Sequence, residues 1–171
     1  MEDDEKKKYI VLGIGIVIMI VVIIILLLIK PKNVATIRIE CTPEKISNVK
    51  KWTFDIGKNK IVSSKIEIME DYMNYDYELV DTITDEVKNE IKSLILQDLG
   101  LEKEKEDGIK VSFEFDNNIN VTIEVDYSKA DKHKLDYMGL NIDDNVDIDN
   151  FIDEVEKYGN ETFTCKKSLI K

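Results

Sequence analysis

The sequence predicts an α+β fold, in which an N-terminal transmembrane helix precedes a two-layer domain that has an antiparallel sheet with helices packed on one face. Three observations support this prediction. Residues 9–29 contain no charge and consist mostly of Ile, Val and Leu. Several later segments alternate apolar and polar residues, as half-buried strands do. Other segments repeat apolar residues every three or four positions, as amphipathic helices do.

The segment Tyr9–Ile29 has the length of a membrane-spanning helix. Its 21 residues, at about 1.5 Å of rise each, match a hydrocarbon core of about 30 Å. A cleaved signal peptide would have a shorter apolar stretch and a small-residue cleavage site, but Lys30-Pro31-Lys32 follows here. A lipoprotein signal does not fit either, because Arg38-Ile39-Glu40 precedes Cys41. We therefore predict an uncleaved anchor.

The lysines around this segment favour one orientation. Lys6 to Lys8 precede it, whereas Lys30 and Lys32 follow it, and cytoplasmic flanks are enriched in lysine. We expect residues 1–8 to form a cytoplasmic tail and residues 33–171 to form an extracytoplasmic domain. The reverse orientation stays open.

The charge balance narrows the classes of partner. Residues 33–171 contain 19 basic and 31 acidic residues, a formal charge of −12. Such an acidic domain disfavours nucleic acid and anionic lipid as partners. The expected partners are the membrane, through Tyr9–Ile29, and an envelope protein or small ligand, with no nucleic acid.

Alternation predicts one strand followed by two hairpins. The first strand spans residues 35–41. The first hairpin joins residues 52–56 to 62–68 through the turn 57–59, and the second joins 109–115 to 119–125 through the turn 116–118. The residues expected on the apolar face of the first strand and hairpin are Ala35, Ile37, Ile39, Cys41, Trp52, Phe54, Ile56, Val62, Ser64, Ile66 and Ile68.

Three helices and a closing strand complete the predicted domain. The first helix is capped by Asp81 or Thr84, has Val87, Ile91, Leu94, Ile95 and Leu99 on its apolar face and ends at Gly100. The acidic and basic run 102–107 is expected to be a loop. A short helix runs from a Ser128 cap to Met138. The last helix is capped by Asp147 and ends at Gly159, and residues 162–165 form the last strand.

The two cysteines lie at the two ends of the predicted domain. Cys41 and Cys165 are both on strand positions expected to point inward, so a disulfide would join the first strand to the last in an oxidising compartment. Two buried free thiols are the alternative, which a cytosolic domain would favour. With the disulfide, the lysine-containing tail 166–171 would begin near the membrane and could contact head groups.

Metal binding is not predicted. Asp143, Asn145, Asp147, Asp149 and Glu154 match the ligand spacing of a calcium-binding loop, but Ile148 occupies the position that needs glycine. Carboxylates at the first turn of a helix explain the same cluster. The single histidine, His133, lies between two lysines and is expected to face solvent.

The sequence also contains no catalytic motif that we can identify. It has no glycine-rich phosphate loop and no nucleophile elbow, and Ser63-Ser64 lies within a predicted strand. We therefore predict a protein that is not an enzyme and that uses no cofactor.

Three tyrosines form the best candidate for a partner contact. Tyr72, Tyr75 and Tyr77 lie among acidic residues, and such amphipathic rings are frequent in contact surfaces. The alternative is that some of these rings cover the edge of the core.

Three short motifs resemble a known family. They are Cys41-Thr42-Pro43-Glu44, the segment Val125-Asp126-Tyr127-Ser128-Lys129-Ala130-Asp131 and the ending from Gly159 to Lys166. Together with the order of elements, they resemble the YehR-like family of small bacterial cell-envelope proteins over most of residues 35–166. The resemblance implies an α+β envelope domain of unknown function and supplies no catalytic residue. This chain differs from that family in having a predicted transmembrane helix instead of a lipid-modified cysteine.

Two functions follow as expectations. The first is a membrane-anchored extracytoplasmic domain that binds or supports a component of the bacterial envelope without catalysis. The second is a small-ligand or cation-binding sensor or accessory module, with its pocket between sheet and helices. The richness in Ile, Lys and Asn favours a bacterial source.

Overall fold

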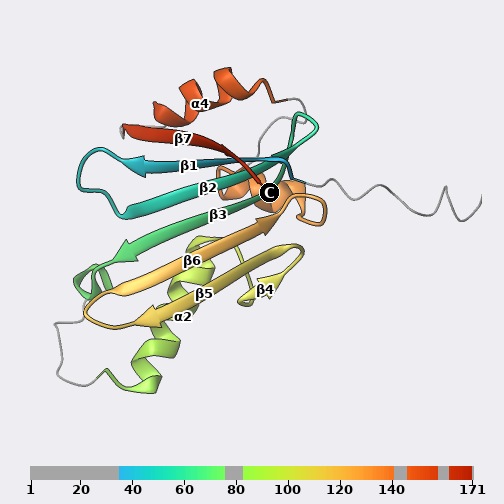
Figure 1. Ribbon diagram of the computed structural model, residues 1–171. Coiled ribbons are helices and arrows are strands. Elements are labelled where there is room, and N and C mark those ends of the chain that lie inside the picture. The colour runs from blue at the N-terminus through green and yellow to red at the C-terminus, as the bar shows by residue number, and fades with distance from the viewer. Residues whose placement is uncertain (1–34, 76–82, 141–145, 158–161, 171) are drawn as a thin grey trace, which may run out of the picture. The chain divides into compact units, whose positions relative to one another are not determined.

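One antiparallel sheet of seven strands organises the described part of the domain, with the strand order β4-β5-β6-β3-β2-β1-β7 (Figure 1). The computed structural model describes residues 35–75, 83–140, 146–157 and 162–170. The chain divides into two compact units, Met1–Asn33 and Val34–Lys171, and all described residues belong to the second. The α+β class is therefore confirmed.

The elements follow the predicted order, with β4 and the 3₁₀ helix η1 in addition. The strands are β1 (Ile37–Pro43), β2 (Val49–Gly57), β3 (Lys60–Glu70), β4 (Lys105–Glu106), β5 (Ile109–Phe115), β6 (Ile119–Asp126) and β7 (Phe163–Leu169). The helices are the 3₁₀ helix η1 (Tyr72–Tyr75), α2 (Asp85–Asp98), α3 (Lys132–Tyr137) and α4 (Ile148–Glu156).

Strand register places the apolar side chains on one face of the sheet. Ile39 lies opposite Phe54, Phe54 opposite Ser64, Ser64 opposite Val125, and Val125 opposite Ile109. All five of these residues are buried. Because successive side chains of a strand point to opposite faces, the residues between them form a second, polar face.

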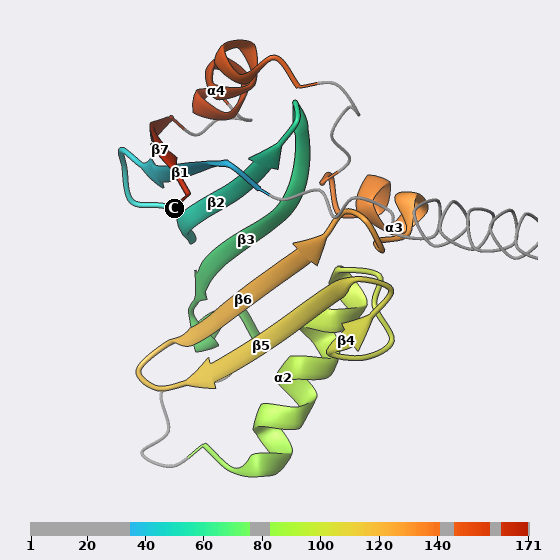
Figure 2. The same cartoon turned by 45° about the vertical axis from the view of Figure 1, so that its right-hand side comes forward.

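The helices lie against the apolar face. The Phe151 ring of α4 meets the Phe54 ring of β2 edge-on, with 4.9 Å between centroids. On α2, Lys92 places its Nζ 5.8 Å from the centre of the Phe113 ring of β5. Figure 2 shows α4 beside the β7–β1 end of the sheet and α2 beside β5. The sheet and the helices thus enclose one apolar core.

The predicted membrane span, residues 9–29, lies outside the described residues. Among the residues that are described, no helix is both long and apolar enough to cross a membrane.

A β-bulge changes the predicted apolar face of β3. Ile56 pairs with Ile61 and Asp55 pairs with Ser63, so Val62 is an extra residue between these two pairs. Ile61 is therefore buried, whereas Val62 is half-buried. The prediction that Val62 shares the core face with Ser64 was wrong, because alternation within one strand does not reveal a bulge.

The helix boundaries also differ in part from the prediction. The Thr84 hydroxyl accepts from the amide of Val87 and caps α2, while Asp81 lies outside the described residues. The cap of α3 is Asp131, whose carboxylate accepts from the amides of His133 and Lys134. The predicted Ser128 cap was therefore wrong. Ser128 instead donates its amide and hydroxyl to the Asp126 carboxylate.

The α2 helix buries a different leucine from the one predicted. Leu96 is buried with Ile91 and Ile95, whereas Leu94 is exposed. The helix thus turns Leu96 toward the core. The cap of α4 by Asp147 is confirmed, since this carboxylate accepts from the amides of Asp149 and Asn150.

Part of the predicted loop 102–107 is a short strand. β4 and β5 form a hairpin whose two-residue turn, Asp107-Gly108, has positive φ at both positions, 42° and 78°. Such a turn matches the twist of paired strands and favours Asp-Gly. The Asp107-Gly108 turn therefore favours the pairing of β4 with β5. The charged composition of residues 102–107, from which a loop was predicted, does not reveal this pairing.

The last strand is longer than predicted and is covalently joined to the first. β7 extends to Leu169, and Cys165 lies opposite Cys41 in its pairing with β1. The two cysteines form a disulfide with a Cα–Cα distance of 4.0 Å. The predicted disulfide is confirmed, and the amide of Cys165 donates to the Glu156 carboxylate at the end of α4.

Replacing Gly108 should destabilise the domain. In Gly108→Ala, the new Cβ would lie 2.7 Å from the backbone nitrogen of Ala130 in a left-handed conformation, at a cost of about 1–3 kcal/mol. Chemical denaturation followed by the fluorescence of Trp52, the only tryptophan, would measure it. In the matched variant Gly100→Ala, the Cβ meets the ring of Tyr137, which can move, so the loss should be smaller. A greater loss in Gly100→Ala would contradict this explanation.

Reduction of the disulfide should lower stability without changing the fold. The bond joins residues separated by 124 positions, so its loss should reduce the free energy of unfolding by about 2–5 kcal/mol. The measurement is denaturation with and without a dithiol reductant. In the control Cys41→Ala/Cys165→Ala, reductant should have no effect, and equal stability of the oxidised and reduced native chain would refute the prediction.

Candidate functional site

The polar face of the sheet is the most distinctive surface of the described chain, and we define it as the open face. It consists of the side chains that alternate with the core residues on β1, β2, β3, β5 and β6. Charged residues of opposite sign face one another there in four pairs. They are Arg38–Asp55, Lys51–Glu40, Lys65–Glu67 and Lys110–Glu124.

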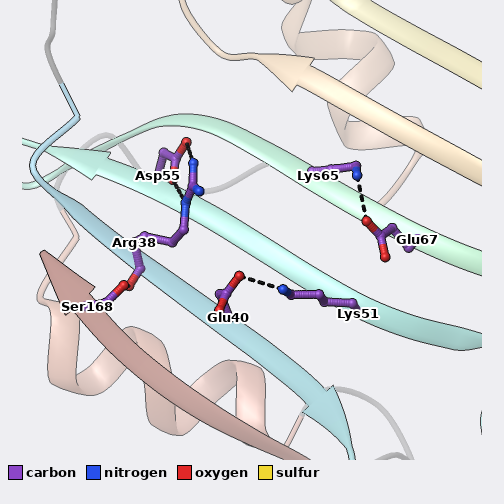
Figure 3. Close-up of polar contacts among 7 residues, drawn as sticks. All are labelled: Arg38, Glu40, Lys51, Asp55, Lys65, Glu67 and Ser168. Carbon is purple, nitrogen blue, oxygen red and sulfur yellow. Dashed lines mark hydrogen bonds and ion pairs between the residues drawn. The ribbon is translucent and has the colours of Figure 1, made fainter. Parts of the chain in front are cut away.

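The Arg38–Asp55 pair has the most specific geometry on the open face. The Arg38 guanidinium donates two hydrogen bonds, of 2.7 and 2.9 Å, to the two carboxylate oxygens of Asp55 (Figure 3). Ser63 on β3 donates a further hydrogen bond of 3.3 Å to the same carboxylate. Such two-point pairing fixes the plane and the position of both groups.

The neighbouring pairs extend this pattern across β1, β2 and β3. The Lys51 ammonium lies 2.5 Å from Glu40, and its hydrogen bond lowers the pKa of that carboxyl although burial opposes the shift. The Lys65 ammonium lies 2.6 Å from Glu67, whose hydrogen bond raises the pKa of Lys65. These pairs are partly exposed, so they contribute little stability. Their main effect is to hold charges at set positions.

The open face is hollowed. A concavity of about 530 Å³ lies over β1, β2, β3 and the ends of β5 and β6. Its lining includes the first three pairs together with Thr53, Lys110 and Glu124. A surface of this size and polarity can accept a hydrophilic segment of a partner.

A second hollow lies beside the β4–β5 turn. Its volume is about 700 Å³, and its lining includes Glu106, Asp107, Lys129 and Lys134. Lys134 of α3 forms ion pairs with the carboxylates of Glu106 and Asp107. The Glu106 side chain is only 7% exposed. The Lys134–Glu106 ion pair is therefore partly buried, and it connects α3 to the β4–β5 hairpin.

Asp126 borders both hollows. Burial alone would raise the pKa of its carboxyl, but hydrogen bonds from Lys129 and Ser128 hold this pKa below its ordinary value. The Ser128 hydroxyl donates over 2.6 Å and the Lys129 ammonium over 2.5 Å. The Asp126 carboxylate therefore accepts hydrogen bonds from both residues and stabilises the turn after β6.

The structure places Tyr72 and Tyr75, two of the three predicted contact tyrosines, in different surroundings. Tyr72 is 1% exposed, and its hydroxyl donates to the carbonyl of Asp116 over 2.9 Å, so its ring belongs to the core and not to a contact surface. Tyr75 is half-buried, and burial raises its pKa to about 12. Tyr77 lies outside the described residues. For Tyr72 the prediction was wrong, because this first residue of η1 packs into the core, as the alternative interpretation of the tyrosines allowed.

The other predicted features fall at ordinary structural positions. His133 is exposed, as expected, and Asp147 caps α4, while Asp143 and Asn145 lie outside the described residues. Within the described ranges, no group of three or more His, Cys, Asp or Glu is arranged to hold a metal ion. The space between sheet and helices, where a ligand pocket was expected, is filled by buried apolar side chains such as Phe54 and Phe151.

Alternation along single strands did not reveal the open face as a candidate site. Its signal was present, since Arg38 and Glu40 alternate with Ile39 and Cys41 along the first strand. The pairing of Arg38 with Asp55 depends on register between strands, and register is not visible in a single strand.

Comparison with known proteins adds no relative. No family model, no curated protein and no solved structure matches the chain.

Loss of the Glu106 charge should destabilise the domain more than loss of an exposed partner. Glu106→Gln removes the buried negative charge that pairs with Lys134 and turns one of the two acceptor oxygens into an amino group, so it should cost about 1–3 kcal/mol in free energy of unfolding. The matched variant Glu124→Gln breaks an exposed pair with Lys110 and should change stability by no more than about 0.5 kcal/mol. Denaturant titration of both variants measures this, and equal losses would show that burial of the pair has no effect.

Proposed function

We propose that the chain is a membrane-anchored domain outside the cytoplasm, which acts without catalysis as a binding or structural module of the bacterial cell envelope. Two separate observations support the two parts of this proposal: the disulfide supports the location, and the open face supports the binding role.

The Cys41–Cys165 disulfide favours an oxidising compartment. Disulfides persist outside the cytoplasm and are rare where glutathione and thioredoxin keep thiols reduced. The apolar segment Tyr9–Ile29, which immediately precedes the domain in sequence, is long enough to anchor it in the membrane.

The open face is the observation on which the proposed binding role depends. It is a hollowed surface on which Arg38–Asp55 and the pairs beside it hold opposite charges at fixed positions. A fixed arrangement of positive and negative charges favours binding of a partner whose charges are arranged in the complementary way, and it disfavours partners with a different arrangement. A hydrophilic protein segment of the envelope fits this description.

A photocrosslinker at the centre of the open face should capture that partner in the native membrane. The probe replaces Thr53 in the full-length chain, and its matched control replaces Gln97, which is exposed on α2. We expect one discrete adduct from Thr53 and none from Gln97. The charge reversal Lys51→Glu should abolish this adduct, because it destroys the pattern that the partner recognises.

Equal labelling at both positions, or an adduct that survives Lys51→Glu, would contradict the proposed binding role.

The location of the domain is tested on the same cells. Protease added outside sealed spheroplasts should degrade the adduct, and survival of the adduct would contradict an extracytoplasmic domain.

A further inference from the structure

The end of β7 lies beside the start of β1, where the chain enters the sheet. Leu169 is opposite Ile37 in the pairing of the two strands. The amide of Ile170 also donates to the carbonyl of Thr36 over 3.0 Å. The last described residues of the chain are therefore held next to its point of entry into the domain (Figure 1).

This point of entry is close in sequence to the proposed anchor. Thr36 follows Ile29, the last residue of the apolar segment, by seven residues. A fully extended chain advances at most about 3.6 Å per residue, so seven residues can span no more than about 25 Å. With residues 9–29 as the proposed anchor, this short connection limits how far Thr36, and the end of β7 bonded to it, can lie from the end of the apolar segment.

Two large apolar side chains are exposed at this end. Leu169 is 78% exposed and Ile170 is 37% exposed. Leu169 is on the same side of β7 as the buried Phe163, yet it remains open to solvent. Leaving such side chains in water is unfavourable, and a lipid interface would bury them.

Two lysines lie at the same end of the sheet as these apolar residues. Lys167 precedes them on β7, where its side chain is 45% exposed and its ammonium lies 3.8 Å from the exposed carboxylate of Asp149 on α4. Lys58 is exposed in the turn between β2 and β3, at the same end of the sheet, since the amide of Thr36 donates to the carbonyl of Ile56. Long cationic side chains can place their stems along apolar surface while the ammonium stays among head groups.

We propose that Leu169 and Ile170 insert into the interfacial region of the lipid bilayer and orient the domain on the membrane. This inference rests on the proposed membrane anchor. The contact depends on apolar burial, with Lys58 and Lys167 among the head groups, so it does not require an overall attraction between an acidic domain and anionic lipid. Two side chains suffice because the anchor already holds the domain at the surface at high effective concentration.

The test uses the full-length chain in nanodiscs of phosphatidylcholine and phosphatidylglycerol, with and without a lipid that has a nitroxide near the top of its acyl chain. Methyl signals are recorded by NMR. We expect the nitroxide lipid to broaden the signals of Leu169 and Ile170 until they are lost. The signal of Ile46, an exposed apolar residue beyond the opposite end of β1, should be retained and serves as the control.

The outcomes separate this inference from the proposed anchor. If the chain does not assemble into nanodiscs, both are overturned. If it assembles but Leu169 is broadened no more than Ile46, only the lipid contact is overturned. If Leu169 is shielded from a water-soluble paramagnetic agent and is not broadened by the lipid, it contacts protein instead, which also overturns the inference. A double variant, Leu169→Ser/Ile170→Ser, should restore access of the water-soluble agent to the backbone amide of Lys167, whose signal is recorded in an amide spectrum of the same nanodiscs.

Discussion

The pairing of β7 with β1 is the contact on which the closure of the domain depends. It joins the last described strand to the first, and every other described element lies between them in sequence. Bringing such distant segments together is costly in chain entropy. The disulfide between Cys41 and Cys165 offsets this cost by restricting the unfolded chain, and it lies within the pairing that it stabilises.

The same register that builds the core also builds the open face. In the antiparallel pairing of β1 with β2, the register that sets Ile39 opposite Phe54 also sets Arg38 opposite Asp55. Because side chains alternate between the two faces, the charged pair lies on the face opposite the core. A shift of one residue would exchange the two faces completely. The ion pairs of the open face are therefore a consequence of burial on the other side, and the candidate site needs no separate scaffold.

Local patterns in the sequence predicted the long strands, the α2 and α4 helices and the inward direction of both cysteines. They failed where the outcome depends on pairing between strands or on a distant part of the chain. The bulge at Val62 arises in the pairing of β2 with β3, and Tyr72 is buried with its hydroxyl bonded to the carbonyl of Asp116, 44 residues away in sequence. The Arg38–Asp55 pair likewise joins two strands whose register no local pattern determines.

The charges of the open face also bear on how a partner would be recognised. Its four ion pairs contain as many positive as negative groups, so they add nothing to the formal charge of −12 of residues 33–171. The acidic excess lies outside these four pairs. A partner of the open face would therefore be selected by the spacing of opposite charges, such as the two-point Arg38–Asp55 pair, and not by a net basic character. Net charge, which the composition reports directly, is for this reason a poor guide to the chemistry of the proposed site.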